Sequence, residues 1–255
     1  MTDATPERDP LTRFTDRVAD YTRFRPSYPA EAIDAILDGL GDPASIVAAD
    51  VGAGTGISAR LLADRGVRVI AIEPNEAMRA GAESHPLVES REGIGEATGL
   101  NDASVNLVLC AQAYHWMDPP RACVEFARVL KPGGRLALMW NDGDESTPVA
   151  RAYYDLIRPI AAEGTLSHKT AAVGPDLAPP FESMCRLTFR NVQRLDADGL
   201  VGRAMSASYV PKTGAAAEAL AAALREVHAA RRDDDGLIPF EYQVQLYLGE
   251  SPRRG

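Results

Sequence analysis

A glycine-rich segment between a predicted strand and a predicted helix constrains the fold of this chain more than any other feature. The segment reads DVGAGTG at residues 50–56 and overlaps the apolar stretch 46–51, which predicts a buried strand. Residues 57–64 carry apolar side chains at helical spacing, and 67–73 predict a second buried strand. This order predicts a strand–helix–strand unit whose two strands lie parallel in one sheet.

The same alternation continues as far as residue 140. Further helices are expected at 29–40, 75–83 and 121–130, and further strands at 88–92, 104–110 and 135–140. Strands that alternate with helices predict an α/β fold, with a mostly parallel sheet covered by helices on both faces.

The pattern weakens after residue 141. We expect a partly helical lid or insert over 142–184, with an amphipathic helix at 149–162. The sequence then predicts a strand at 185–192 and helices at 196–205 and 215–230. Apolar and polar residues alternate strictly over 240–248, which predicts a strand with one wet face, as in an antiparallel edge hairpin.

Length and composition predict one domain with one large core. The chain has 255 residues, of which 45% are hydrophobic, and we expect a flexible lead-in at 1–20 followed by a single domain over 21–255. The net charge of -9 and the absence of a dense Lys/Arg stripe argue against a nucleic-acid partner. No stretch reads as a signal peptide or a membrane span, so we expect a cytoplasmic protein with no membrane partner.

The cysteines agree with a reducing compartment. Cys110, Cys123 and Cys185 are odd in number and form no CxxC pair. They therefore predict neither a disulfide framework nor a zinc site.

The glycine loop predicts a site for a nucleotide-like ligand. Glycines allow a tight turn and a close approach to the backbone, and the following helix offers unpaired N–H groups. Residues 54–59 also fit the looser G-x-G-x-x-G/A pattern of dinucleotide binders, so glycine spacing leaves the cofactor open. Asp50 favours S-adenosylmethionine (SAM), because its carboxylate would repel a pyrophosphate but attract the ammonium of an amino acid.

Two later positions extend the predicted cofactor site. Glu73 ends the second predicted strand, where a carboxylate can accept hydrogen bonds from both hydroxyls of a ribose. Glu96 and Ala97 follow the third predicted strand, where the backbone and a side chain can meet the edge of an adenine.

Several motifs between residues 21 and 141 point to one family. The glycine motif at 50–56, Glu73 and the turn LKPGGRL at 130–136 resemble those of the class I SAM-dependent methyltransferases. The segments YTRFRPSYP at 21–29 and AQAYHW at 111–116 resemble, more narrowly, the branch of trans-aconitate methyltransferase-like (methyltransferase type 11) proteins.

The resemblance implies a Rossmann-like sheet of seven strands with an antiparallel last strand. It also implies that SAM is the cofactor, that S-adenosyl-L-homocysteine is the product, and that an N-terminal segment folds over SAM. Together, the residues expected to bind the cofactor are Tyr21, Arg25, Asp50, Gly52, Ala53, Gly54, Gly56, Glu73, Pro74, Met78, Glu96, Ala97 and Ala111.

The expected reaction is an in-line displacement on the methyl group of the sulfonium. Its main demands are close positioning and exclusion of water, and a metal is not required. The expected acceptor is a small molecule, such as a metabolite or an intermediate of a natural product. His115 is the candidate base for a hydroxyl, amine or carbon acceptor, whereas a carboxylate acceptor needs no base.

The acceptor site is expected at the rim formed by the predicted lid and the strand ends. Its candidate residues are Tyr28, Trp116, Asn141, Tyr153 and Tyr209. A carboxylate acceptor would predict a basic pocket with Arg25, Arg151 or Lys212, and the other acceptors an aromatic pocket.

Two other functions remain open from the sequence. The loose glycine match also permits an NAD(P)-dependent oxidoreductase, and a SAM-binding partner subunit without catalysis would carry the same motifs. A monomer and a homodimer are both compatible with the sequence.

Overall fold

The computed structural model describes residues 18–161 and 184–250 of the chain. Most of the predicted lead-in and the second half of the predicted lid lie outside these residues. The strands are β1 Val47–Val51, β2 Arg68–Ile72, β3 Val88–Arg91, β4 Val105–Ala111, β5 Leu130–Gly143, β6 Met184–Leu195 and β7 Ile238–Glu250. The helices are α1 Val18–Phe24, α2 Ala30–Leu37, α3 Ile57–Ala63, α4 Glu76–Ala80, α5 Pro119–Val129, α6 Pro148–Ile157, α7 Ala197–Met205 and α8 Ala215–Arg231, with short 3-10 turns η2 Pro43–Ser45 and η3 Tyr114–Trp116.

All seven strands form one sheet in the order β3-β2-β1-β4-β5-β7-β6. Strands β1 to β5 pair in parallel, whereas β7 runs antiparallel to both β5 and β6. The predicted mostly parallel sheet with an antiparallel last strand is thereby confirmed. Strand β7 is not itself the edge, because β6 covers it and forms the edge of the sheet.

Apolar side chains leave the sheet on both faces, so helices cover both. On β1, the fully buried Ala48 belongs to a cluster with Ile33 of α2 and Leu62 of α3. Its neighbour Ala49 points to the other face and belongs to a cluster with Phe126 of α5. This alternation follows from the period of two residues along a strand.

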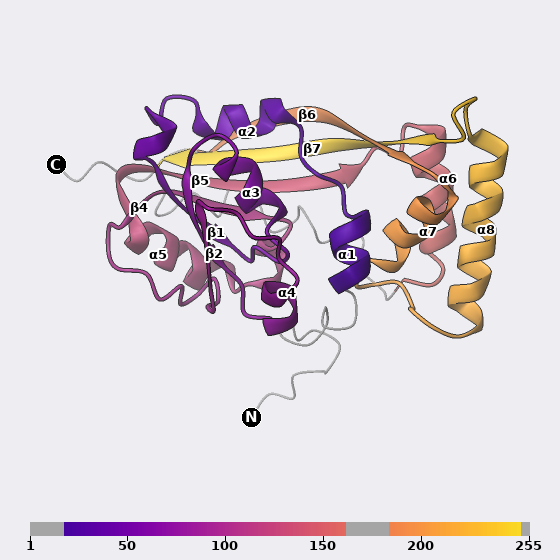
Figure 1. The fold of residues 1–255 in the computed structure, drawn as a ribbon, viewed down its shortest axis with the longest axis horizontal. Helices are drawn as coiled ribbons and strands as arrows, with labels where there is room; N and C mark the ends of the chain where they lie inside the picture. The colour runs from indigo at the N-terminus through magenta and orange to yellow at the C-terminus, as the bar shows by residue number, and fades with distance from the viewer. Residues whose placement is uncertain (1–17, 162–183, 251–255) are drawn as a thin grey trace.

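The antiparallel pair formed by β6 and β7 is longer than the sequence predicts. The predicted strands 185–192 and 240–248 extend to Met184–Leu195 and Ile238–Glu250, and their paired register continues over this whole length. This strand pair reaches past the parallel strands, and α6, α7 and α8 gather at its far end (Figure 1). These three helices and β7 bury a third apolar cluster, which includes Tyr153, Leu200 and Phe240.

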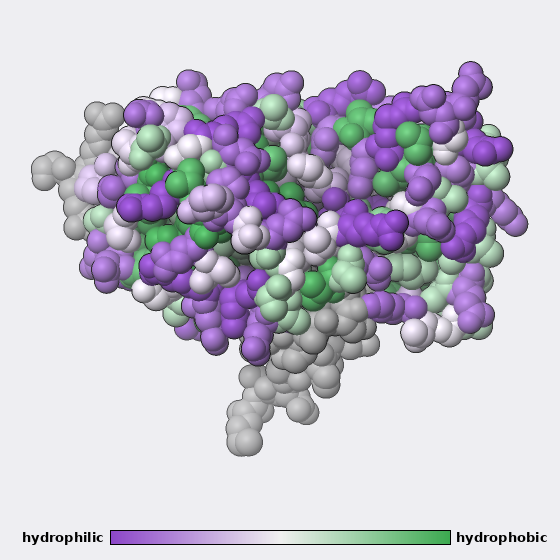
Figure 2. Space-filling model, viewed as in Figure 1, coloured by the Kyte–Doolittle hydropathy of each residue, from purple (hydrophilic) through white to green (hydrophobic). Residues whose placement is uncertain are grey.

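Other boundaries differ from the predictions by a few residues. Strand β5 begins at Leu130 rather than at 135, because Leu130 already pairs with Val105 across an irregular register. Helix α6 ends at Ile157, five residues before the predicted end at 162. On the face shown in Figure 2, polar residues cover most of the surface and apolar residues form small separate areas.

Phe240 tests how strongly the third cluster holds α6 against β7. Its ring is fully buried, and its centroid lies 4.9 Å from that of Tyr153 at an interplanar angle of 83°. We expect Phe240→Ala to lower the free energy of unfolding by about 3–5 kcal/mol, because it deletes a buried ring and leaves a cavity. Urea denaturation measures this loss.

The matched control is Val124→Ala, since the Val124 side chain is 68% exposed. This substitution should change the free energy of unfolding by less than about 0.5 kcal/mol. Equal losses in the two variants would contradict the assignment of Phe240 to the core.

Candidate active site

The candidate site lies at the carboxyl ends of β1, β2 and β4, around the glycine loop. Gly52 has a φ of 71°, and a Cβ atom there would lie 2.4 Å from the Cβ of Ala113. Any side chain would therefore push apart the segments that follow β1 and β4. Gly54 has a φ of 59°, and its Cα faces the Met78 methyl and the Tyr21 ring across a narrow space. The loop thus needs glycine for both conformation and close packing.

Glu73 fixes the glycine loop to the end of β2. Its Oε2 atom accepts a hydrogen bond of 2.9 Å from the backbone N–H of Gly54, and its Oε1 atom accepts one of 2.9 Å from that of Asn75. Burial raises the pKa of the Glu73 carboxyl above its usual range, although these two N–H donors oppose the rise. A carboxylate offers about four lone-pair positions, so two remain for a ligand.

Asp50 lies beneath the loop rather than on the surface of the cleft. Its side chain is fully buried, and its Oδ2 atom accepts a 2.7 Å hydrogen bond from the Ser58 hydroxyl. The Oδ1 atom is buried without a hydrogen-bond partner. Burial raises the pKa of the Asp50 carboxyl to about 7, and the Ser58 hydrogen bond offsets part of that rise. An orphaned carboxylate oxygen beside a glycine loop fits a cationic ligand group.

Two adjoining hollows meet at the loop. Both contain Tyr21, Gly52, Ala111 and Gln112 in their walls. The first hollow extends along Gly54, Glu73, Pro74, Met78, Ile94, Gly95, Glu96, Ala113, Trp116 and Met117. The second extends along Arg25, Pro26, Tyr28, Ala53, Ile57, Ser58 and Asn141. The two hollows therefore adjoin and form the two halves of the candidate cleft: one half is acidic and partly apolar, and the other half contains an arginine.

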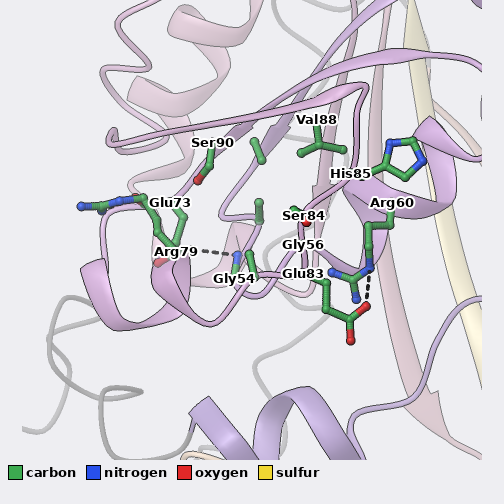
Figure 3. Close-up of a pocket in the computed structure, with 13 residues that line it drawn as sticks. Gly54, Gly56, Arg60, Glu73, Arg79, Glu83, Ser84, His85, Val88 and Ser90 are labelled. Atoms are coloured by element: carbon green, nitrogen blue, oxygen red, sulfur yellow. Dashed lines mark hydrogen bonds and ion pairs between the residues drawn. The ribbon is translucent and has the colours of Figure 1, made fainter.

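A third hollow lies beside the loop and shares Gly54 and Glu73 with the first hollow (Figure 3). There the Arg79 guanidinium donates to the carbonyl oxygens of Glu73 and Pro74 at 2.7 and 2.8 Å. Arg60 donates to the Thr55 carbonyl at 2.8 Å and pairs with Glu83 at 3.4 Å, as Figure 3 shows. Arg60 therefore holds the loop at Thr55, and Arg79 holds the backbone that follows β2.

Helix α1 closes the cleft from the N-terminal side. The Phe24 ring packs against Gly202 of α7, where a Cβ atom would come within 2.2 Å of the ring. The Arg25 guanidinium lies 4.7 Å from the centroid of the Tyr21 ring and donates to the Ser206 carbonyl at 3.1 Å. Helix α1 therefore bridges the glycine loop and α7.

Asn141 is held in the wall of the second hollow by two contacts. Its amide nitrogen donates to the Ser27 carbonyl at 3.1 Å, and its Oδ1 atom accepts from Asn191 at 3.0 Å. Its side chain is therefore oriented before any ligand binds.

Most of the residues predicted for the site line one of the two cleft hollows. The exceptions are Asp50 below the loop, Gly56 in the third hollow, the exposed Ala97, and His115, Tyr153 and Tyr209. Tyr153 and Tyr209 instead belong to the third apolar cluster.

His115 has a contact that bears on its predicted role as a base. The Trp140 indole N–H donates to the Nδ1 atom of His115 at 3.3 Å. If Nδ1 accepts, the proton of the neutral ring lies on Nε2, so neither nitrogen offers an unengaged lone pair. The base role stays a prediction, and this contact weighs against it.

Gln112 was missed by the sequence analysis. Its backbone has a φ of 57°, which is uncommon outside glycine, and its side chain donates to the Asn141 carbonyl at 3.1 Å. Because it lines both cleft hollows, it lies where they meet. The only signal for Gln112 in the sequence is its position within the AQAYHW segment, because residue spacing does not predict a left-handed backbone conformation.

Comparisons with known proteins show that part of the chain resembles methyltransferases. A family model described as a methyltransferase domain matches residues 49–138. An uncharacterized methyltransferase of Mycobacterium tuberculosis is 43% identical over 151 residues, which are 59% of this chain and 60% of that protein. One from Schizosaccharomyces pombe is 41% identical over 145 residues, 56% of each chain. The match thus spans less than two thirds of the length of these relatives.

Solved structures agree with this assignment. A proposed type II methyltransferase from Anaeromyxobacter dehalogenans has 27% identity and a TM-score of 0.69, over 91% of this chain and 100% of that one. Geranyl diphosphate C-methyltransferase from Streptomyces coelicolor, solved with S-adenosyl-L-homocysteine, shares the fold with a TM-score of 0.52 at 14% identity, over 98% of this chain and 100% of that one. Within the described ranges, no helix combines the length and apolar character that crossing a membrane requires. Residues 49–138 therefore match a methyltransferase domain, and the sheet order and the solved structures give the chain the fold of the class I SAM-dependent methyltransferases.

Proposed function

We propose that this protein transfers the methyl group of SAM to a small-molecule acceptor. The observation that carries the proposal is the pair of adjoining hollows, since the one that contains Glu73 and the one that contains Arg25 and Asn141 share Gly52 in their walls. One half suits the cofactor and the other half suits an acceptor, so both reactants can meet beside the loop.

The first half of the cleft fits the adenosine part of SAM. Glu73 offers carboxylate lone pairs to ribose hydroxyls, and Met78, Ile94 and Met117 offer an apolar wall to a flat base. The orphaned Oδ1 atom of Asp50 beneath the loop fits the ammonium group of the methionine part. In this arrangement Gly52 allows the ligand to lie directly on the backbone.

The second half of the cleft encloses about 20 Å³, so it receives a small part of an acceptor, and a larger acceptor requires helix α1 to move outward. Tyr28 and Asn141 line it together with the loop, and Arg25 adds a positive charge. SAM supplies a methyl group on a sulfonium, which leaves without a protonation step, so the protein must mainly align the acceptor and exclude water. Helix α1, seated between the loop and α7, covers the cleft and suits that task.

A non-catalytic SAM-binding subunit remains the alternative. The polar lining of the second hollow favours an enzyme, because a subunit without catalysis has no need of an oriented Asn141 beside the cofactor half. We also propose a cytoplasmic setting, since Cys110, Cys123 and Cys185 are free thiols in the structure, and either a monomer or a homodimer.

The test is a pair of measurements on the full chain. Calorimetric titration with SAM, S-adenosyl-L-homocysteine and NAD(P)H measures cofactor choice, and conversion of SAM to S-adenosyl-L-homocysteine measures turnover against a library of small acceptors. Binding of both adenosyl ligands together with acceptor-dependent turnover supports an enzyme. Tight binding without turnover on any acceptor class would favour the subunit, and binding of NAD(P)H alone would reject both.

Glu73→Ala tests the cofactor half of the cleft. We expect the dissociation constant for S-adenosyl-L-homocysteine to rise about 30-fold or more, because the ribose loses a charged acceptor and the loop loses its tie to β2. Glu83→Ala is the matched control, since Glu83 is exposed and lines only the third hollow. Calorimetry should show a change of less than about twofold for the control. Equal affinities in the two variants would place the ribose elsewhere.

Asp50→Asn tests the buried carboxyl through the pH dependence of stability. The carboxyl ionises near its ordinary pKa of 3.8 in the unfolded chain and near 7 in the folded one, so folding favours the protonated form. The contribution of Asp50 is therefore fully present below pH 3.8 and is lost as the pH rises to about 7. We expect Asp50→Asn to become more stable than wild type as the pH rises over this interval. The gain is at most about 1.4 kcal/mol for each tenfold difference in the ionisation constant of Asp50 between the folded and the unfolded chain.

Urea denaturation at a series of pH values measures that difference. Ser58→Ala is the control, because it removes only the hydroxyl that stabilises the ionised carboxyl and should steepen the loss of stability. A difference between Asp50→Asn and wild type that does not vary with pH would contradict a raised pKa at Asp50.

His115→Ala tests the base hypothesis. Because the Nδ1 atom of His115 already accepts from Trp140, we expect kcat on an identified acceptor to fall by less than about tenfold. The pH–rate profile should keep its shape. A fall of about a hundredfold or more, with loss of an ionisation from the profile, would instead establish His115 as the base.

A further inference from the structure

Gln112 follows β4 and has a backbone conformation that a residue with a side chain rarely adopts. Its φ is 57°, in the left-handed region, and its backbone N–H donates to the Met139 carbonyl of β5 at 2.8 Å. This conformation is strained for glutamine, so the surrounding structure must enforce it. Because strained residues of this kind collect at functional sites, the conformation points to a role for Gln112 beyond packing.

The carboxamide of Gln112 is held in one orientation. Its Nε2 atom donates to the Asn141 carbonyl of β5 at 3.1 Å. Only the NH₂ end of an amide can donate to a carbonyl, so this contact decides which end of the carboxamide faces Asn141. The oxygen Oε1 is therefore the end that is left for other partners, and its direction is set before any ligand binds.

The Oε1 atom of Gln112 is open to a ligand. Within residues 18–161 and 184–250 no group donates a hydrogen bond to it, and it is not shut off from solvent. The side chain is half-buried and lines both hollows of the cleft. The accessible oxygen therefore faces the space where the two hollows meet.

Other negative groups lie away from this junction. The residues that line both hollows are Tyr21, Gly52, Ala111 and Gln112. Glu73 and Glu96 line the first hollow but not the second, and Asp50 is fully buried beneath the loop. The Tyr21 ring already faces the Arg25 guanidinium at 4.7 Å. The amide oxygen of Gln112 therefore supplies the negative end of a dipole at the junction.

The two forms of the cofactor differ in charge at the atom that reacts. SAM has a positively charged sulfur, which polarises the C–H bonds of its methyl group, whereas S-adenosyl-L-homocysteine has a neutral thioether with lone pairs. An amide oxygen attracts a cation and polarised C–H groups, but it gains nothing from a thioether, which is itself an acceptor. A fixed amide oxygen can therefore distinguish the substrate form from the product form.

We propose that the Oε1 atom of Gln112 faces the sulfonium methyl group and makes the cleft favour SAM over S-adenosyl-L-homocysteine. This rests on the proposed function, in which the methyl group passes to the acceptor where the two halves of the cleft meet. The contact is lost once the methyl group has left, so it favours release of the product. Gln112 is accordingly a residue that determines specificity for the charged cofactor.

Gln112→Met tests the proposal without an acceptor, because methionine keeps an unbranched chain of similar length and lacks the amide. Calorimetric titration of the full chain measures the two dissociation constants separately. We expect the constant for SAM to rise about fivefold and that for S-adenosyl-L-homocysteine to change by less than about twofold. Gln243→Met is the matched control, since the Gln243 amide donates to Asp144 at 2.9 Å and lines neither half of the cleft. Its ratio of the two constants should equal that of wild type.

Gln112→Gly separates loss of the amide from backbone strain. Glycine adopts a φ of 57° without strain, so the backbone can keep its conformation while the side chain is lost. We expect the same change in the ratio of the two dissociation constants as in Gln112→Met. A changed ratio in Gln112→Met alone would assign the effect to a strained methionine and overturn the proposal.

Sinefungin is a second probe, because it has an ammonium group on carbon where SAM has the methyl group on sulfur. Its N–H groups can donate to Oε1 directly, and such a charge-assisted hydrogen bond is stronger than a C–H contact. We expect its dissociation constant to rise about tenfold or more in both Gln112 variants. Unchanged affinity for sinefungin in both would place Gln112 away from the reacting centre and overturn the proposal.

The outcomes separate this proposal from the proposed function. Parallel rises for SAM and S-adenosyl-L-homocysteine, at a constant ratio, would make Gln112 a structural residue of the cleft and overturn the proposal while the proposed function stands. A raised KM for an acceptor at an unchanged ratio would assign Gln112 to the acceptor instead, with the same result. Failure of wild type to bind either adenosyl ligand would overturn the proposed function itself.

Discussion

The hydrogen bond from the Gly54 N–H to the Glu73 carboxylate joins the parts of the structure on which the site depends. It ties the loop after β1 to the end of β2, and Arg79 holds the carbonyl of the same Glu73. Since β1 and β2 are paired in register from Val47 to Val51, the ends of both strands reach the same edge of the sheet. The glycine-rich loop and a carboxylate then form one wall of a cleft whose backbone is held in place by hydrogen bonds.

The parallel part of the fold was predictable because its signals are local. The alternation of apolar strands with amphipathic helices and the spacing of glycines each depend on nearby residues, so β1, α3 and β2 were expected close to where they occur. Glu73 was found for the same reason, since its position at the end of a strand identifies it. The lengths of β6 and β7 were underestimated because they depend on pairing with each other and on the packing of α6 to α8 at their far end.

The second half of the cleft was predicted less well, because it forms only through long-range contacts. Asn141 was expected at the rim and lies there, but its orientation depends on Asn191, which is far away in sequence. Tyr153 was expected beside the acceptor, yet its ring packs on Phe240. Gln112 has no distinctive sequence pattern. A left-handed backbone becomes visible only when the surrounding elements are in place.

The same long-range packing explains why charge is divided between the two halves of the cleft. The acids Asp50 and Glu73 come from the ends of adjacent parallel strands, and the sheet places them together below and beside the cofactor loop. Arg25 follows α1 directly and bonds to the end of α7, which packs on α1 after the long strand β6 has brought the chain back. The strained Gln112, which lies where the two halves meet, occupies the position where alignment of the two reactants matters most.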